Sequence, residues 1–144
     1  MIHIEINKLE ADLFLALYTS VGWVPPCKEQ VVKALENTIA TFVAYDNEKP
    51  VGMVRLIGDC GMSFYIKDFA VIPPYQSQGI GKMLIESVEK YIKEAVGEWA
   101  VSLELISTIE AEGFYKKMGF EARPCEWDGP GMFKMIRKSS AMMQ

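Results

Sequence analysis

The chain has 144 residues, of which 50% are apolar and 24% charged, and a net charge of −4. This length and composition predict a single folded domain over residues 1–144. No apolar run reaches the roughly eighteen residues of a membrane span, so no membrane partner is expected. The acidic balance argues against a nucleic-acid partner, which usually requires a basic face.

Cysteine and histidine usage indicates a reducing compartment and no metal. Cys27, Cys60 and Cys125 form no Cys-x-x-Cys pair, and the N-terminus lacks the basic and apolar stretches of a signal peptide. We therefore expect a cytoplasmic location with free thiols. The only histidine is His3, and no Cys/His cluster has ligand spacing, so no metal site is expected.

Apolar periodicity and turn residues predict the order of strands and helices. In chain order, the predicted elements are a strand over 2–6, helices over 10–21 and 27–39, strands over 41–45, 51–57 and 63–72, a helix over 80–96, a strand over 100–106, a helix over 110–118, and strands over 120–123 and 132–136. This order predicts an α+β fold in which helices flank a mixed sheet.

The stretch Gln76-Ser77-Gln78-Gly79-Ile80-Gly81-Lys82 joins the predicted strand over 63–72 to the helix over 80–96. A strand that turns through glycines into a helix directs backbone N–H groups and the positive end of the helix dipole at one point, which can hold a phosphate. A tight turn without a ligand is the alternative. A dinucleotide fingerprint would need glycine where Leu84 stands, and a Walker loop would need Ser or Thr at Met83.

A second motif lies roughly thirty residues further on, at Ala111-Glu112-Gly113-Phe114-Tyr115-Lys116-Lys117-Met118-Gly119-Phe120. It resembles the Ala-x-x-Phe-Tyr-x-x-x-Gly-Phe segment of the general control non-repressible-type (GNAT) N-acetyltransferases. The glycine stretch resembles their acyl-CoA pyrophosphate loop, Gln/Arg-x-x-Gly-x-Gly/Ala, and the residues over 69–73 resemble the strand that leads into it. The resemblance implies a GNAT-like fold with a mixed, mostly antiparallel central sheet.

The resemblance also implies the activity and the cofactor contacts. An acetyl group would move from acetyl-CoA to a primary amine by direct attack in a ternary complex. The residues implied to bind acetyl-CoA are Phe69, Ala70, Val71, Gln76, Ser77, Gln78, Gly79, Ile80, Gly81, Lys82, Thr108 and Tyr115. Thr108 departs from the pattern, since many relatives have asparagine there, and its hydroxyl has a shorter reach and a single donor.

Tyr115 is the candidate acid that protonates the departing thiolate, because in the resembling motif this tyrosine lies near the cofactor sulfur. A tyrosine that packs its ring on the sheet is the alternative. Asp68 is the candidate base, with Asp59 and Glu104 as alternatives. Strand alternation predicts that Asp68 and Lys67 face opposite sides of the sheet.

In the family that the chain resembles, the acceptor site is built by the first two helices, their connecting loop, and the loop between the last two strands. Here these loops carry Trp23 and Trp127, with Glu126 and Asp128 as ammonium partners. Both tryptophans could equally be core residues. We expect a small, partly hydrophobic amine as the acceptor. A peptide or protein amine, or a non-catalytic acyl-CoA-binding module, remains open, as does a homodimer.

Overall fold

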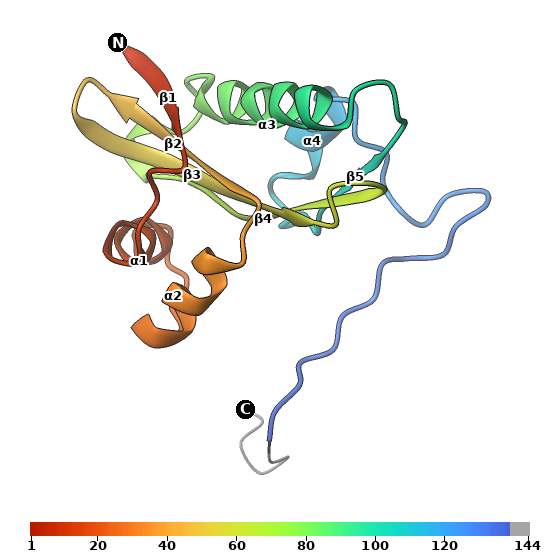
Figure 1. Ribbon diagram of the computed structural model, residues 1–144, viewed down its shortest axis with the longest axis horizontal. Coiled ribbons are helices and arrows are strands. Elements are labelled where there is room, and N and C mark those ends of the chain that lie inside the picture. The colour runs from red at the N-terminus through yellow and green to blue at the C-terminus, as the bar shows by residue number, and fades with distance from the viewer. Residues whose placement is uncertain (139–144) are drawn as a thin grey trace. The chain divides into compact units, whose positions relative to one another are not determined.

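The computed structural model describes residues 1–138 (Figure 1). The chain divides into two compact units, Met1–Leu105 and a second that begins at Ile106. The elements of the first unit are β1 (Ile2–Ile6), α1 (Ala11–Ser20), α2 (Lys28–Glu36), β2 (Ala40–Asp46), β3 (Lys49–Gly58), β4 (Ser63–Val71), the 3-10 helix η1 (Pro73–Tyr75), α3 (Ile80–Val96) and β5 (Ser102–Glu104). The second unit contains α4 (Glu112–Lys117). The single domain predicted over 1–144 stays a prediction.

The five strands form one sheet in the order β1-β2-β3-β4-β5. The first three pairings are antiparallel, and β5 joins β4 in parallel. The prediction of an α+β fold with a mixed, mostly antiparallel sheet is therefore confirmed. The parallel pairing covers only Ser63–Tyr65 of β4, whereas the strand continues along β3 to Val71.

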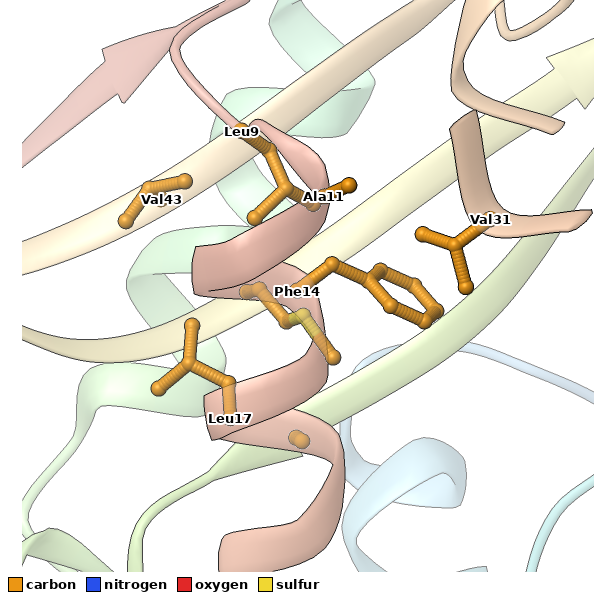
Figure 2. Close-up of a cluster of buried hydrophobic side chains, with 8 residues drawn as sticks. Leu9, Ala11, Phe14, Leu17, Val31 and Val43 are labelled. Carbon is orange, nitrogen blue, oxygen red and sulfur yellow. The ribbon is translucent and has the colours of Figure 1, made fainter. Parts of the chain in front are cut away.

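The helices α1 and α2 cover one face of this sheet. Phe14 and Leu17 of α1 are buried together with Val31 of α2 and with Val43 and Met53 of the sheet. Figure 2 shows the Phe14 ring extending from α1 toward Val31. Burying apolar side chains of this size contributes about 1.5–3 kcal/mol each, so this cluster holds the two helices on the sheet.

The helix α3 covers the opposite face, as Figure 1 shows. The Phe42 ring lies edge-on to Tyr91 of α3, whereas its neighbour Val43 points into the α1 cluster. Alternation along β2 therefore separates the two cores. Buried residues recur along α3 at helical spacing, namely Ile80, Leu84, Ile85, Val88, Ile92 and Val96. Glycines bound this helix at both ends, and its bounds match the prediction.

A β-bulge interrupts the pairing of β3 with β4. Met53 is opposite Ala70, but Arg55 is opposite Lys67, so β4 contains one residue more than β3 at this point. Asp68 takes up the extra length with a left-handed φ of 55°. The alternation that predicted opposite faces for Lys67 and Asp68 fails here, because the Asp68 carboxylate reaches Arg55, the ladder partner of Lys67.

The two strands predicted over 120–123 and 132–136 are wrong for the described part of the chain, in which both segments are irregular. Phe120 instead closes the turn after α4, where its N–H donates to the Tyr115 carbonyl. The large side chains of Met132, Phe133 and Ile136 are mostly exposed, so this segment has no buried face of the kind that fixes a strand. The strand predicted over 100–106 shortens to β5, which lies at the edge of the sheet.

Candidate active site

The predicted pyrophosphate loop lies between η1 and α3. Two of its residues have left-handed backbone, Ser77 with φ 63° and Gly79 with φ 85°. Open space surrounds the position that a Cβ of Gly79 would occupy, so the backbone conformation rather than crowding favours glycine there. A ligand can therefore approach the backbone at Gly79 closely.

The first turn of α3 supplies backbone donors beside Gly79. Met83 N–H donates to the Gly79 carbonyl at 3.2 Å, which is the first hydrogen bond of the helix. The N–H groups of Ile80, Gly81 and Lys82 therefore lie outside the helical ladder, at the positive end of a helix of 17 residues. Backbone donors at a helix start of this kind suit an anionic group such as a phosphate.

The glutamines of the loop shape its backbone. The Gln76 side-chain amide donates to the Val71 carbonyl at 2.8 Å, and the Gln78 amide donates to the Pro74 carbonyl at 2.9 Å. In this structure, both side chains hold the turn rather than extend outward.

On the α1–α2 face, a polar cluster surrounds the bulge. The Arg55 Nε donates to Asp68 Oδ2 at 2.8 Å, and the two side chains are only 15% and 12% exposed. Arg55 Nη1 also donates to the Thr38 hydroxyl at 3.3 Å. Asp68 is thus an anchored carboxylate within this polar cluster.

Aromatic side chains of α1 and the following loop lie near this carboxylate. The Tyr18 ring stacks on Phe14 and meets Trp23 edge-on, with 5.0 Å between the Tyr18 and Trp23 ring centroids. Burial, followed by the charge of Asp68, raises the pKa of Tyr18. The first unit therefore brings Asp68 and the predicted acceptor residue Trp23 into one neighbourhood around Tyr18.

The two alternative bases have other partners. Asp59 Oδ1 accepts the N–H groups of Gly61, Met62 and Ser63 at 2.8–3.0 Å, which lowers the pKa of this carboxyl to about 2. A carboxylate held in this way is a turn-forming group and a weak base. Glu104 on β5 is exposed and accepts the Ser102 hydroxyl at 3.1 Å.

The second unit holds Tyr115 on α4. Its ring lies edge-on to both Phe114 and Phe120, at centroid distances of 5.2 and 5.6 Å. Burial raises the pKa of Tyr115 to about 12. The phenol therefore carries its proton throughout the neutral range, as a general acid must.

The remaining predicted residues of the second unit are exposed. Thr108 precedes α4, and its carbonyl accepts the Ala111 N–H at 3.2 Å. Trp127 is 71% exposed, in a turn closed by an ion pair of 2.8 Å between Arg123 and Asp128. The core alternative for Trp127 therefore has no support within the second unit.

Several residues near these groups were not predicted from the sequence, namely Tyr18, Thr38, Asp46, Arg55 and Tyr75. Arg55 did give a signal, because it is the one charged residue in the apolar stretch over 51–57. A charge inside a buried strand usually has a buried partner. The contact of Tyr75 with Asp46 joins residues 29 positions apart and follows no sequence period.

Residues 16–138 match the family model for the acetyltransferase (GNAT) domain. The chain therefore belongs to the GNAT acetyltransferase family, which confirms the resemblance and identifies an acetyltransferase. It is 34% identical to an uncharacterized N-acetyltransferase of Pyropia yezoensis, over 90% of this chain and 72% of that protein. It is 30% identical to the chloroplastic GCN5-related N-acetyltransferase 1 of Arabidopsis thaliana, over 90% of this chain and 64% of that protein.

Two bacterial structures resemble most of the chain. One, from meticillin-resistant Staphylococcus aureus, is described as a probable acetyltransferase and has a TM-score of 0.82 and 34% identity, covering 94% of this chain and 100% of that one. The other is a GNAT family acetyltransferase of Streptococcus pneumoniae, with a TM-score of 0.80 and 33% identity, covering 96% of this chain and 100% of that one. Both support the assignment of fold and family.

Within residues 1–138, no helix combines the length and the apolar character needed to cross a membrane. No group of three or more His, Cys, Asp or Glu side chains in the same range gathers as a metal site would require.

Proposed function

We propose that this protein transfers the acetyl group of acetyl-CoA to a primary amine, through direct attack of the amine in a ternary complex. The observation that carries this proposal is the loop at Gln76–Lys82. Its left-handed Ser77 and Gly79 precede the backbone donors of the first α3 turn, and open space surrounds the Cβ position of Gly79. Membership of the acetyltransferase family supports the same ligand.

Other residues are proposed to bind the pantetheine arm, to stabilise the oxyanion and to protonate the sulfur. Bound acetyl-CoA supplies a thioester that is already activated, so positioning carries much of the catalysis. The backbone of β4 near Ala70, beyond the end of the β5 ladder, is proposed to bind the pantetheine arm and the developing oxyanion. Tyr115 is proposed to donate its phenolic proton to the sulfur as the carbon–sulfur bond breaks and the carbon–nitrogen bond forms.

Asp68 is proposed to bind the acceptor ammonium and to accept its proton, directly or through a water. Arg55 contacts Oδ2, so Oδ1 is the oxygen that would meet the amine. The rings of Tyr18 and Trp23 offer an apolar and cation-binding surface near this carboxylate. This combination favours a small amine with a partly hydrophobic body.

Thiol release from acetyl-CoA, measured across a panel of small amines and peptides, tests the proposal. Gly81→Val is the loop variant, because it places a branched side chain beside the backbone N–H groups of the first α3 turn. Glu86→Val adds the same side chain at an exposed position of the same helix and serves as the control. We expect thermal stabilisation by acetyl-CoA for wild type and Glu86→Val, and its loss for Gly81→Val. Absence of stabilisation and of thiol release in wild type would refute the proposal.

A protein amine is the second candidate acceptor. The chain is 29% identical to a soybean protein named histone acetyltransferase TAP1, over 76% of this chain and 51% of that protein. Peptide acceptors that outperform every small amine in kcat/KM would favour this candidate. Cofactor binding without thiol release to any amine would indicate a non-catalytic module.

A further inference from the structure

The segment that leads into the pyrophosphate loop is attached to a distant turn of the sheet by one side chain. The Tyr75 hydroxyl donates to Asp46 Oδ2 at 2.7 Å. Asp46 is the last residue of β2 and pairs with Lys49, the first residue of β3, so the two close the hairpin. The Lys49 ammonium lies 5.3 Å from the centroid of the Tyr75 ring. Tyr75 therefore contacts both ends of this turn.

Tyr75 lies between two points at which the chain is held by the rest of the unit, Ile72 and Ile80. Before it, Ile72 N–H donates to the Val51 carbonyl at 2.9 Å. After it, Ile80 is buried as the first residue of α3. The side-chain bonds of Gln76 and Gln78 in between reach only five and four residues back along the chain. These bonds shape the loop, and that of Gln76 ends on Val71, the last residue of β4, but neither reaches the β2–β3 turn.

The loop also contains backbone that needs external support. Ser77 is a non-glycine residue with a left-handed φ of 63°, an unfavourable conformation that persists only when its surroundings hold it. When a loop becomes ordered only on binding, the entropy cost of ordering weakens the affinity for the ligand. A loop that is already ordered does not carry this cost. A fixed point at Tyr75, two residues before Ser77, supplies such order.

We propose that Tyr75 is a positioning residue for acetyl-CoA: its hydroxyl, bonded to Asp46 at the β2–β3 turn, holds the chain in the conformation that receives the pyrophosphate. This inference rests on the proposed function of the same loop. The bond has a charged acceptor, which makes it stronger than a neutral hydrogen bond. In agreement, the Tyr75 hydroxyl lowers the pKa of Asp46, and Asp46 raises the pKa of Tyr75.

The test measures CoA binding to Tyr75→Phe by calorimetry, together with steady-state kinetics. We expect the Kd of CoA and the KM of acetyl-CoA to rise roughly threefold to tenfold. The kcat at saturating acetyl-CoA and the KM of the amine should stay within about twofold, because the hydroxyl acts only on the loop. A purely structural role would lower the Tm without this split between KM and kcat. The matched control is Tyr45→Phe, which removes a hydroxyl from the residue next to Asp46.

A double-mutant cycle that combines Tyr75→Phe with Asp46→Ala tests whether the effect on CoA binding comes from the bond between these two side chains. Asp46 also accepts the Met1 ammonium on Oδ1 at 3.2 Å, a contact that Asp46→Ala removes and Tyr75→Phe keeps. The double variant should still bind CoA no more weakly than the weaker single variant, since both single variants remove the Tyr75–Asp46 bond. Asp46→Asn keeps an acceptor oxygen and should recover part of the affinity.

Wild-type CoA affinity in Tyr75→Phe, or fully additive losses in the cycle, would overturn the inference. Wild-type protein that does not bind CoA would instead refute the proposed function of the loop. If Tyr75→Phe does not fold, the comparison of Asp46→Asn with Asp46→Ala decides the matter.

Discussion

Asp68 is the most constrained side chain of the candidate site. It has a left-handed backbone within a strand, and its carboxylate is anchored by Arg55 at 2.8 Å. A left-handed non-glycine residue costs roughly 1–2 kcal/mol. The bulge and the largely buried ion pair keep Asp68 in this conformation, and strain of this kind often accompanies function.

Replacement of Asp68 by Asn separates charge from backbone geometry. Asparagine tolerates left-handed backbone, so Asp68→Asn should fold, but it loses the negative charge proposed to bind and deprotonate the amine. We expect kcat/KM for the amine to fall about 10²-fold or more, with little change in the Kd of acetyl-CoA. Asp12→Asn is the control, because Asp12 makes a surface ion pair with Lys28 at 2.9 Å. Equal activity of the two variants would remove Asp68 from the mechanism.

Tyr115 can be tested by removal of one oxygen. Tyr115→Phe should preserve the edge-on packing against Phe114 and Phe120 while it removes the proposed proton donor. We expect kcat to fall about 10²- to 10⁴-fold with an unchanged KM for acetyl-CoA. Tyr91→Phe, on the sheet face of α3, is the matched control. A kcat within about twofold of wild type would mean that the thiolate leaves unprotonated or takes its proton from water.

The pH dependence of Tyr115 has a defined sign. Its pKa in the folded protein is about 12, above the reference value of 10.0, because burial disfavours the phenolate. The corresponding stability is fully present below pH 10.0 and is lost as the pH rises through about 12. Loss of kcat through this phenol is likewise expected only near that pKa.

Among the elements, the turn between β3 and β4 depends on one carboxylate. Asp59 accepts three backbone N–H groups, which lowers its pKa from 3.8 to about 2. Stability from this charge is present above pH 3.8 and is lost as the pH falls through about 2.

Variants at Asp59 distinguish a turn-forming group from a catalytic base. Asp59→Ala should lower the Tm at neutral pH, and Asp59→Asn, which keeps an acceptor oxygen, should lower it less. The Tm difference between wild type and Asp59→Ala should shrink as the pH falls through about 2, where the carboxyl becomes neutral. Both variants should retain wild-type kcat at temperatures where they are folded. A large loss of kcat in the Asn variant would restore Asp59 as a candidate base.

Local signals determined which elements could be predicted from the sequence. Helix α3 matched its prediction because glycines mark both ends and six buried residues follow one period. The bulge at Asp68 could not be predicted, because strand alternation assumes one residue per ladder step. The strands expected over 120–123 and 132–136 failed for the opposite reason. Their apolar residues gave a strand-like pattern, but a strand also needs a partner, which no local pattern supplies.

For the whole molecule, the family match runs through both compact units. It covers residues 16–138, and so includes the glycine loop and Asp68 of the first unit and Tyr115 of the second. The motifs that carried the resemblance likewise lie one in each unit. Under the proposed function, neither unit alone holds both the pyrophosphate loop and the proton donor.

The two predicted acceptor tryptophans also belong to different units, and their role stays a prediction. Trp23 packs against Tyr18, whereas Trp127 is 71% exposed. The sequence has three tryptophans, and Trp99, which is 68% exposed, is the one not assigned to the acceptor. In a Trp99→Phe background, Trp23→Phe and Trp127→Phe each leave a single fluorescent reporter. An acceptor that contacts both should change the emission of each reporter with the same half-saturation concentration.

Kinetics complete this test. Trp127→Ala should raise the KM of the amine by roughly tenfold and leave the KM of acetyl-CoA unchanged, because burial of an exposed indole would contribute to acceptor binding alone. Trp99→Ala, which removes an indole of similar exposure, is the matched control. A reporter at Trp23 that does not respond to the acceptor would leave this ring as a core residue beside Tyr18. Equal effects of Trp127→Ala on both KM values would show that Trp127 acts on the protein as a whole rather than on the acceptor.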